Sequence, residues 1–455
     1  MMLLGEQIDV LGQAESLELQ GTVTEVRGLA VFVADLPAPI GAQVTIGPVA
    51  GEVVGFNEQQ TVVMPIGSTA GIGPGDAVVA QQFAQTVGVS ESMLGRVVDA
   101  MGRPLDGGGG LGGVVFRPLH PPALEPMDRP RIDLPLATGV RAIDALVSVG
   151  RGQRLGVIAA PGVGKSTLLG MMARGTDADV NVIALVGERG RELREFIDNN
   201  LGPEGLARSV VVCATSDEPP VMRLRSALTA AAVAEYFRDQ GKDVLLIMDS
   251  VTRFCQAQRQ IGLASGEPPA TKGYPPSVFA ILPALLERCG RTQKGSITGF
   301  FAVLMETEDV ADPIAEAARG VLDGHVMLSR KLAGRGHWPA IDVVESISRV
   351  SDDVTDGQHQ SARANVLKLI NAYREVEDLL NIGAYAAGSN AEFDLAIACK
   401  PAVDRLLQQG RADASEKRDV DVFDRTKKQL LAVVEQIRIA QGELERTGRR
   451  GSVAA

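Results

Sequence analysis

Short apolar runs, separated by turn residues, fill the first part of the chain. Glycine and proline residues such as Gly28, Pro37, Gly51 and Pro74 end one run before the next begins. Runs of this length predict β-strands, and the turn residues predict tight connections between them. We therefore expect a small all-β barrel or sandwich, with strands at residues 21–26, 29–33, 44–46, 52–55, 61–64 and 77–80.

The pattern changes twice in the middle of the chain. A glycine cluster at residues 107–110 and a proline-rich stretch at 117–135 argue against regular helix and interior strand, so a connector is predicted there. From about residue 138 to 350, aliphatic and β-branched runs alternate with segments of helix length. This alternation predicts a mainly parallel sheet covered by helices, with strands at 155–158, 180–185, 210–213, 244–248 and 297–304.

The last part of the chain is predicted to be helical. Strand-like runs stop after Asp352, and residues 361–382 and 421–441 have helical patterns. Phe423, Leu430, Val434 and Ile437 recur at helical spacing, which indicates a stripe facing the core, the alternative being a face for a partner. Residues 448–455 are expected to form a loose tail. The predicted domains are 1–90 (barrel), 91–350 (connector and sheet) and 351–455 (helices).

Composition narrows the function. The 455 residues carry a formal charge of −11, which argues against nonspecific binding to nucleic acid. The 4 cysteines lie far apart and lack zinc or redox spacing, so reduced thiols in the cytoplasm are expected. No apolar run approaches the roughly 20 residues of a membrane span, and the N-terminus lacks the pattern of a secretory signal.

The sharpest chemical signal lies between a predicted strand and a predicted helix. Residues 159–166 read Ala-Ala-Pro-Gly-Val-Gly-Lys-Ser. Glycines allow backbone N–H groups to surround phosphate oxygens, Lys165 reaches the β and γ phosphates, and the Ser166 hydroxyl binds Mg²⁺. Ala159 replaces the usual first glycine, which a strand's last residue tolerates; a plain glycine turn is the alternative. The predicted nucleotide-binding residues here are Pro161, Gly162, Val163, Gly164, Lys165, Ser166 and Thr167.

Two further strands deliver charges to the same edge of the sheet. The run 244–248 ends in Asp249, where a second Mg²⁺ ligand belongs; a carboxylate capping the next turn is the alternative. The run 182–186 leads to Glu188 and Arg189, which can orient a water molecule and balance charge on a γ-phosphate. A surface ion pair would use the same residue types, so the residue types alone do not distinguish a catalytic pair from a surface ion pair.

Further motifs extend along the chain. They are Gly187-Glu188-Arg189-Gly190-Arg191, Asp249-Ser250-Val251-Thr252-Arg253-Phe254, Gly273-Tyr274-Pro275-Pro276, Gly295-Ser296-Ile297-Thr298, Asp312-Pro313 and Ser346-Ile347-Ser348-Arg349-Val350. In this order they resemble the catalytic subunits of rotary ATPases and their homo-oligomeric relatives. A second set comprises Gly55-Phe56-Asn57, Met64-Pro65, Pro118-Leu119-His120, Asp323-Gly324-His325, Pro339-Ala340-Ile341-Asp342, Gly383-Ala384-Tyr385 and Gly388-Ser389. These look like the flagellar protein-export ATPase and the injectisome type III secretion ATPase, over about residues 21–397.

The resemblance implies a fold and a site. It implies a RecA-like P-loop domain between the barrel and the helices, with ATP and Mg²⁺ bound. Glu188 would polarise the attacking water, Arg189 would face the γ-phosphate beside Lys165, and Arg349 would enter a neighbour's site as an arginine finger. The aromatic residue before Pro-Ala-Ile-Asp, here Trp338, would stack on adenine; a packed core tryptophan is the alternative.

The resemblance also implies partners. The expected assembly is a homohexamer at the cytoplasmic face of the inner membrane, with a stator-like regulator, a central stalk protein, an export gate at the membrane, export substrates and chaperones, and no nucleic acid. Relatives bind the regulator and the membrane through a helical segment before the barrel. Here the segment before Gly21 is short, with Leu4, Ile8 and Leu11 at helical spacing.

Several alternatives remain at this point. The same machine could serve an injectisome, which neighbouring genes would decide. A rotary synthase subunit is disfavoured because the C-terminal helices lack an acidic Asp-Glu-Leu-Ser-Glu-Glu-Asp-like run. A noncatalytic ring subunit would be expected to lose Glu188 or Lys165, and an RNA translocase would need cations and aromatics in the barrel. His325, His337 and His359 lack ligand companions and are predicted to be structural.

Overall fold

Six strands at the start of the chain close into a barrel in the computed structural model, which describes residues 18–57, 59–82, 85–305, 312–411, 413 and 421–453. The antiparallel order is β1-β2-β5-β4-β3-β6, and each predicted run lies in one of these strands, so the barrel is confirmed. Valines at alternating positions fill its interior. The strands are β1 (Gln20–Arg27), β2 (Ala30–Ala34), β3 (Gln43–Ile46), β4 (Val49–Phe56), β5 (Thr61–Pro65) and β6 (Ala77–Gln82).

The connector contains short elements. β7 (Thr86–Val89) pairs with β9 (Val115–Pro118), and β10 (Pro135–Leu136) pairs with β11 (Val149–Gly150). Between β7 and β9, β8 (Val97–Val98) joins the edge of the central sheet beside β14. Two 3₁₀ turns, η1 (Glu91–Met93) and η2 (Pro126–Asp128), complete the segment. The connector therefore also contributes an edge strand to the sheet, which the sequence pattern did not predict.

The central sheet has the order β19-β18-β12-β17-β15-β13-β14-β8. Its long strands pair in parallel, apart from β19 at one edge and the short β16 (Gly290–Arg291) beside β17. Every run predicted for this region is a strand. The bounds are β12 (Arg154–Ala159), β13 (Val180–Glu188), β14 (Ser209–Thr215), β15 (Asp243–Asp249), β17 (Ser296–Leu304), β18 (Gly324–Leu328) and β19 (Ile341–Ser348).

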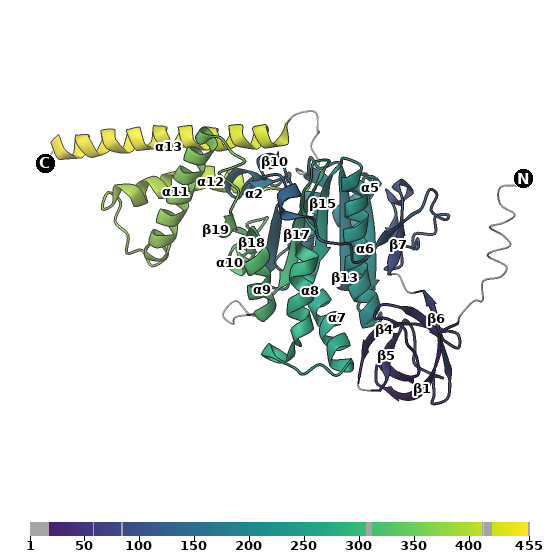
Figure 1. Cartoon of the computed structure of the whole chain (residues 1–455). Helices are drawn as coiled ribbons and strands as arrows, with labels where there is room; N and C mark the ends of the chain where they lie inside the picture. The colour runs from purple at the N-terminus through teal and green to yellow at the C-terminus, as the bar shows by residue number, and fades with distance from the viewer. Residues whose placement is uncertain are drawn as a thin grey trace, which may run out of the picture.

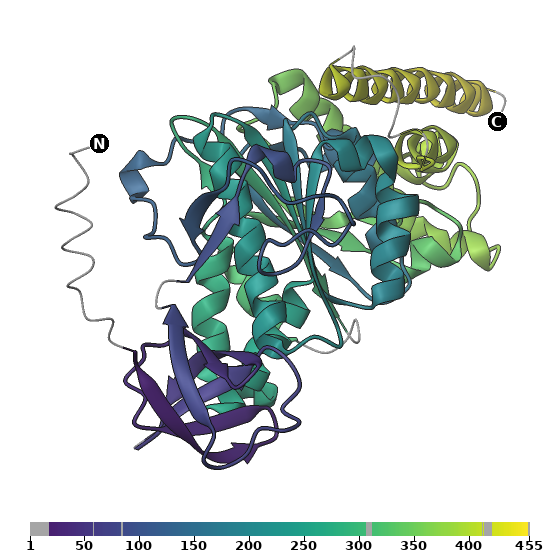
Figure 2. The ribbon, with the colours of Figure 1, turned by 90° about the vertical axis from the view of Figure 1, so that its right-hand side faces the viewer.

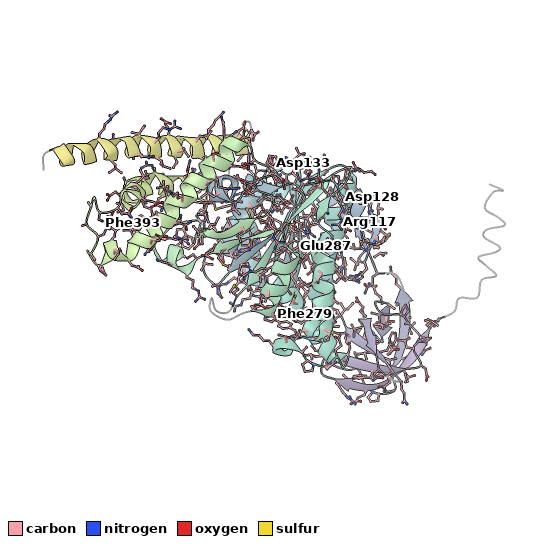
Figure 3. The ribbon with its side chains drawn as sticks, turned by 60° about the vertical axis from the view of Figure 1, so that its left-hand side comes forward. Arg117, Asp128, Asp133, Phe279, Glu287 and Phe393 are labelled. Carbon is pink, nitrogen blue, oxygen red and sulfur yellow. The ribbon has the colours of Figure 1, made fainter. Side chains whose placement is uncertain are left out.

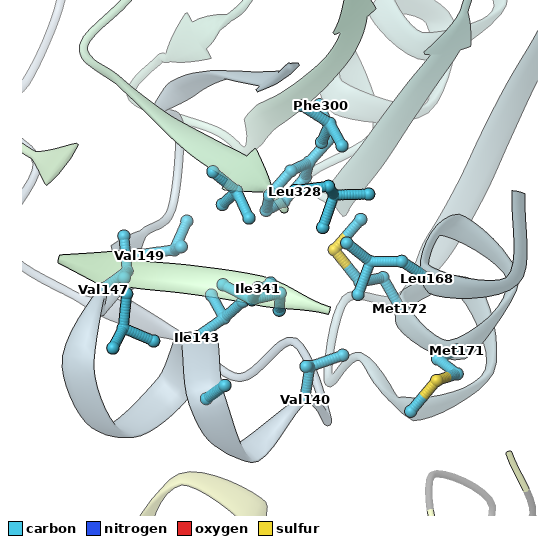
Figure 4. Packing of buried hydrophobic residues seen from close by; sticks show 14 of the residues in the cluster. Val140, Ile143, Val147, Val149, Leu168, Met171, Met172, Phe300, Leu328 and Ile341 are labelled. Atoms are coloured by element: carbon cyan, nitrogen blue, oxygen red, sulfur yellow. The ribbon is translucent and has the colours of Figure 1, made fainter. Parts of the chain in front are cut away.

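Helices cover both faces of this sheet (Figure 2). Successive residues of β13 point to opposite sides of the sheet: Ile183 belongs to one apolar cluster and Val182 to the other. Figure 4 shows the first cluster, where Leu168 and Met172 of α3 lie near Ile341. The helices are α2 (Arg141–Leu146), α3 (Lys165–Gly175), α4 (Gly190–Glu195), π-helical η3 (Phe196–Leu201), α5 (Gly202–Ala207), α6 (Pro220–Asp239), α7 (Val251–Ala264), η4 (Thr271–Gly273), α8 (Pro276–Leu286), α9 (Pro313–Val321) and α10 (Arg330–Gly334).

Three helices end the chain, at the opposite end of the molecule from the barrel (Figure 1). They are α11 (Gly357–Asn381), α12 (Ala391–Leu407) and α13 (Val422–Val453). The predicted stripe is confirmed: Phe423, Leu430 and Ile437 are buried, and Val434 packs against the same core. The expected loose tail is wrong as far as Val453, because an established helix propagates at little cost.

Two further predictions concern the state of the cysteines and membrane-spanning helices. Cys213, Cys255, Cys289 and Cys399 are all buried free thiols, as predicted. In the part of the chain that the structure describes, no helix is both long and apolar enough to span a membrane. The short segment before Gly21, which corresponds in position to the regulator-binding helix of relatives, lies almost wholly outside the described residues.

Gly139 should limit the stability of the central sheet domain. Its φ of +75° is unfavourable for other residues, and an added Cβ would lie 2.5 Å from the Cα of Gly175, at the end of α3. We expect Gly139→Ala to lower the free energy of unfolding by about 3 kcal/mol, from backbone strain plus overpacking. Urea denaturation measures the change.

The control for this prediction is Gly266→Ala. Gly266 also has a positive φ, +90°, but a Cβ there would meet no atom within 4 Å. It should lose only about 1 kcal/mol, from strain alone. Equal losses in the two variants would contradict the close contact between Gly139 and α3.

Candidate functional site

The turn between β12 and α3 forms a phosphate-binding loop. Gly162 and Gly164 have φ values of +82° and +87°, a left-handed backbone conformation that glycine adopts without strain and that lets the loop turn tightly. Val163, in contrast, is buried and anchors the loop to the core. The first helical hydrogen bond runs from the Leu168 N–H to the Gly164 carbonyl oxygen (3.0 Å), so the preceding amides are available at the helix N-terminus.

The other predicted loop residues surround this turn. Pro161 and Ser166 are exposed, whereas Thr167 is half-buried in the first turn of α3. Ala159 is buried as the last residue of β12, which explains why the missing glycine is tolerated. The structure therefore brings all the predicted loop residues to one strand-to-helix junction.

Lys165 and Asp249 form an ion pair across this junction. Asp249 is the last residue of β15, one strand beyond β17 from the loop, and only 2% of it is exposed. A buried carboxylate is retained where a cation pairs with it. Together with the Ser166 hydroxyl, Asp249 supplies the oxygen ligands that Mg²⁺ prefers, so the residues present fit this metal.

Glu188 ends the neighbouring strand β13. Its Oε1 lies 3.3 Å from the Nε of Arg253, and another guanidinium nitrogen of Arg253 donates to the Gly187 carbonyl oxygen at 2.7 Å. Burial, with the Asp249 charge, raises the pKa of Glu188 to about 7, although Lys165 and Arg253 oppose the shift. Glu188 is therefore poised to exchange a proton near neutral pH.

Arg189 lies at the same edge, where its side chain contacts Glu192. It precedes α4, its side chain is 71% exposed, and its guanidinium pairs with Glu192 at 3.4 Å. Glu192 in turn hydrogen-bonds with Glu188, which lowers the Glu192 pKa. The structure thus places Arg189 near the predicted site, in contact with Glu192 and not with the phosphate loop.

Trp338 lies against the phosphate loop. A Cβ on Gly164 would come within 2.8 Å of the indole Cζ3, and the tryptophan remains 43% exposed. The backbone of Trp338 is held by the segment just after α12, since the Gln409 N–H donates to its carbonyl oxygen at 2.8 Å. This position differs from that of a packed core tryptophan.

Arg349 lies at the amino edge of the sheet, where the parallel strands begin, opposite the carboxyl edge that carries the phosphate loop. It follows β19, where Ser348 pairs with Gly324, the first residue of β18. Because β18 and β12 are parallel, the start of β18 is remote from the loop after β12. The described structure therefore does not bring the exposed Arg349 to the loop of its own chain.

Sequence reasoning gave no role to Arg253 or Glu192. Both belong to quoted or adjacent motifs, Arg253 in the first turn of α7 and Glu192 in that of α4. The histidines predicted to be structural each have a hydrogen-bond partner: the rings of His325 and His359 bond to the carbonyl oxygens of Glu345 and Ala145. His337 lies 3.3 Å from the Gln408 amide.

A phosphate loop at the carboxyl edge of a parallel sheet, with a lysine and a strand-end aspartate, defines a P-loop nucleoside triphosphatase. The family model of the ATP synthase alpha/beta nucleotide-binding domain matches residues 139–348, and that of the T3SS EscN ATPase C-terminal domain matches residues 355–420. The chain belongs to the family of flagellum-specific and type III secretion ATPases, and it is an ATP-hydrolysing enzyme.

Relatives from both secretion systems are similar over most of their length. The flagellum-specific ATP synthase of Pseudomonas aeruginosa is 50% identical over 408 residues, covering 88% of this chain and 90% of that protein. The type 3 secretion system ATPase of Xanthomonas euvesicatoria is 48% identical, covering 86% and 89%. The solved structure of the assembled ATPase EscN from enteropathogenic E. coli has a TM-score of 0.85 at 42% identity, covering 91% of this chain and 100% of EscN.

The fluorescence of Trp338 should report nucleotide binding. It is the single tryptophan of the chain and lies beside Gly164. We expect a saturable change in its emission when ATP or ADP is titrated with Mg²⁺, because the ligand changes the solvent around the indole. The Trp338→Phe variant should lose the signal yet still bind nucleotide in equilibrium dialysis. Binding by dialysis without any change in wild-type emission would contradict this placement.

Proposed function

We propose that the protein is the Mg²⁺-dependent ATPase of a flagellar protein-export apparatus. In this proposal it works as a homohexameric ring and couples ATP hydrolysis to the delivery and unloading of export substrates. The observation that carries the proposal is the division of charges between two sheet edges. Lys165, Asp249 and Glu188 gather at the phosphate loop, whereas Arg349 is exposed at the far edge.

Nucleotide binding is assigned to the loop and to Trp338. The backbone N–H groups of residues 162–167 and the Lys165 ammonium would hold the phosphates, with Pro161 shaping the start of the loop, and the exposed indole of Trp338 would stack on the adenine. Ser166 and Asp249 would hold Mg²⁺, which supplies positive charge for the γ-phosphate oxygens. The ion pair between Lys165 and Asp249 supports this assignment because it holds both groups beside the loop.

Glu188 is assigned as the residue that orients and deprotonates the attacking water. Its pKa of about 7 suits a base near neutral pH, and its contact with Arg253 fixes the carboxylate. Arg189 would face the γ-phosphate after its exposed side chain leaves Glu192. The chain's own residues thus supply phosphate binding, a base and one cation at a single edge.

Arg349 is assigned to the site of the next subunit. A strand of the length of β12 separates the two edges by about 17 Å, which is too far for an arginine to cross. Head-to-tail contacts between identical subunits would close this gap and build a ring. The assembled state of EscN, and its complex with the central stalk EscO, support self-assembly and a stalk partner for this chain.

The remaining partners follow from the export role. We assign a stator-like regulator, the export gate, export substrates and chaperones as partners, at the cytoplasmic face of the inner membrane. The flagellar system is preferred because relatives with that name reach 50% identity. A secretion ATPase at 48% keeps the injectisome as the second candidate, and the neighbouring genes would distinguish the two.

Replacing Glu188 should separate binding from hydrolysis. Glu188→Gln removes the base but keeps the size of the side chain, so turnover should fall by about 10²- to 10⁴-fold. ATP affinity, measured through Trp338 fluorescence, should stay close to that of the wild type. Phosphate release measures the turnover.

The pH profile tests the same assignment. The base must be ionised, so wild-type kcat/KM should rise with pH through an apparent pKa near 7 and then level off. The matched control is Glu195→Gln, on the exposed side of α4, which should retain wild-type turnover. Normal hydrolysis by Glu188→Gln would remove the assigned role.

Mixing experiments test the assignment of Arg349. The Arg349→Ala and Glu188→Gln variants should each be inactive alone. In mixed rings, an Arg349→Ala subunit keeps its loop and can receive Arg349 from a Glu188→Gln neighbour. Up to about a quarter of the contacts in an equal mixture should then be active.

The readout is steady-state phosphate release at several mixing ratios and protein concentrations. Specific activity of the wild type should also climb with concentration, because the site is completed by assembly. Absence of recovery at every ratio would exclude a site shared between identical subunits.

A further inference from the structure

Arg349 follows β19 in a turn that we call the corner. Hydrogen bonds connect this corner, through Asp323, to the first residue of β12, the strand that ends at the phosphate loop. The backbone N–H of Arg349 donates to the Asp323 carbonyl oxygen at 2.9 Å. Asp323 ends the turn before β18 and belongs to the Asp-Gly-His motif, to which the proposed ATPase chemistry assigns no role. The contacts of this motif therefore decide where Arg349 is presented.

Asp323 is bound to the first residue of β12 in both directions. The Asp323 N–H donates to the Arg154 carbonyl oxygen at 2.8 Å, and the Arg154 N–H donates to the Asp323 carboxylate at 3.0 Å. The Arg154 guanidinium adds two contacts to the same carboxylate, at 3.1 and 3.2 Å. Arg154 also pairs with Glu287, which Figure 3 labels.

The other residues of the motif hold β19 itself. A Cβ at Gly324 would lie 2.1 Å from the Ile347 carbonyl oxygen, so only glycine permits this approach. The ring of His325 hydrogen-bonds with the Glu345 carbonyl oxygen at 2.9 Å. Each residue of the motif thus contacts either Arg349 itself or the second half of β19, which leads to it.

Gln153, the residue immediately before β12, adds a second connection. It is fully buried, and its amide donates to the Ser348 hydroxyl at 3.0 Å and to the Asp323 carbonyl oxygen at 3.3 Å. Ser348 immediately precedes Arg349. Two consecutive residues, Gln153 and Arg154, therefore hold the corner from which Arg349 projects.

We infer that Asp323 and Arg154 are positioning residues for Arg349 and link each subunit's phosphate loop to the arginine that it offers to its neighbour. The inference rests on the proposed function, in which Arg349 acts in the adjacent site. β12 forms the link, because it starts at this corner and ends at the loop. Since its residues from 155 to 159 are buried within the sheet, movement at one end is transmitted to the other.

The test uses the full-length Asp323→Asn variant. Loss of the carboxylate charge weakens the contact of the Arg154 guanidinium with residue 323 and leaves Glu287 as its carboxylate partner, so the corner should loosen and turnover should fall at least about tenfold. Its own phosphate loop should still bind ATP, with unchanged affinity by Trp338 fluorescence. Asp133→Asn is the matched control: Asp133 pairs with Arg291 near the same edge but does not contact Arg349, so turnover should stay unchanged.

Mixed rings distinguish positioning from general damage. Asp323→Asn mixed with Glu188→Gln should recover activity, because the Glu188→Gln subunit offers an intact corner to an intact loop. Asp323→Asn mixed with Arg349→Ala should recover none, because both lack the same function. Recovery with Arg349→Ala, or none with Glu188→Gln, would overturn the inference.

Two comparisons keep the outcome interpretable. Recovery in the pair of Arg349→Ala with Glu188→Gln tests the shared site itself, so its failure belongs to the proposed function. If Asp323→Asn does not fold, Arg154→Lys keeps the positive charge and the main-chain bond but loses the two-pronged contact. It should show the same recovery pattern with a smaller loss, and wild-type turnover in this variant would also overturn the inference.

Discussion

Parallel pairing of β12 with β17 and β18 is the constraint on which both edges of the molecule depend. The strand is bonded on both sides and its residues from Leu155 to Ala159 are buried. A slip of one residue would exchange the two faces of the strand and place core side chains on the wrong side. Register therefore fixes the start of the phosphate loop at one end and Arg154 at the other.

In the proposed function, the charges around the loop serve the chemistry of the site more than the stability of the fold. The Lys165 and Asp249 side chains are only 11% and 3% exposed, and a buried ion pair adds little net stability to a fold. Both charges act on Glu188, at the end of β13, the strand next to the β15 strand that carries Asp249. Burial and the Asp249 charge raise its pKa, while Lys165 and Arg253 limit the rise, so the balance lies near neutral pH.

Much of this arrangement could be predicted from the sequence, because the signals are local. The strands of the barrel and sheet are apolar runs bounded by glycine and proline, and the loop is one continuous motif. β8 was missed because two valines carry no periodicity, and the end of α13 because glycine and arginine at its end resemble a tail. The contact of Arg253 with Glu188 depends on β15 lying beside β13, which only strand order reveals.

Charged residues lie at both the carboxyl and the amino edge of the sheet, and this separation explains why ATP hydrolysis would depend on assembly. The exposed Arg349 at the amino edge lies too far from the loop of its own chain to reach it, but a head-to-tail contact would present that edge to the loop of the next copy. In the proposed ring, each β12 then spans two neighbouring sites: its end shapes one, and its start holds the corner that completes the other. Because β12 is buried on both sides and close-packed, it would carry a displacement of the loop to the corner in this proposal without a separate signalling element.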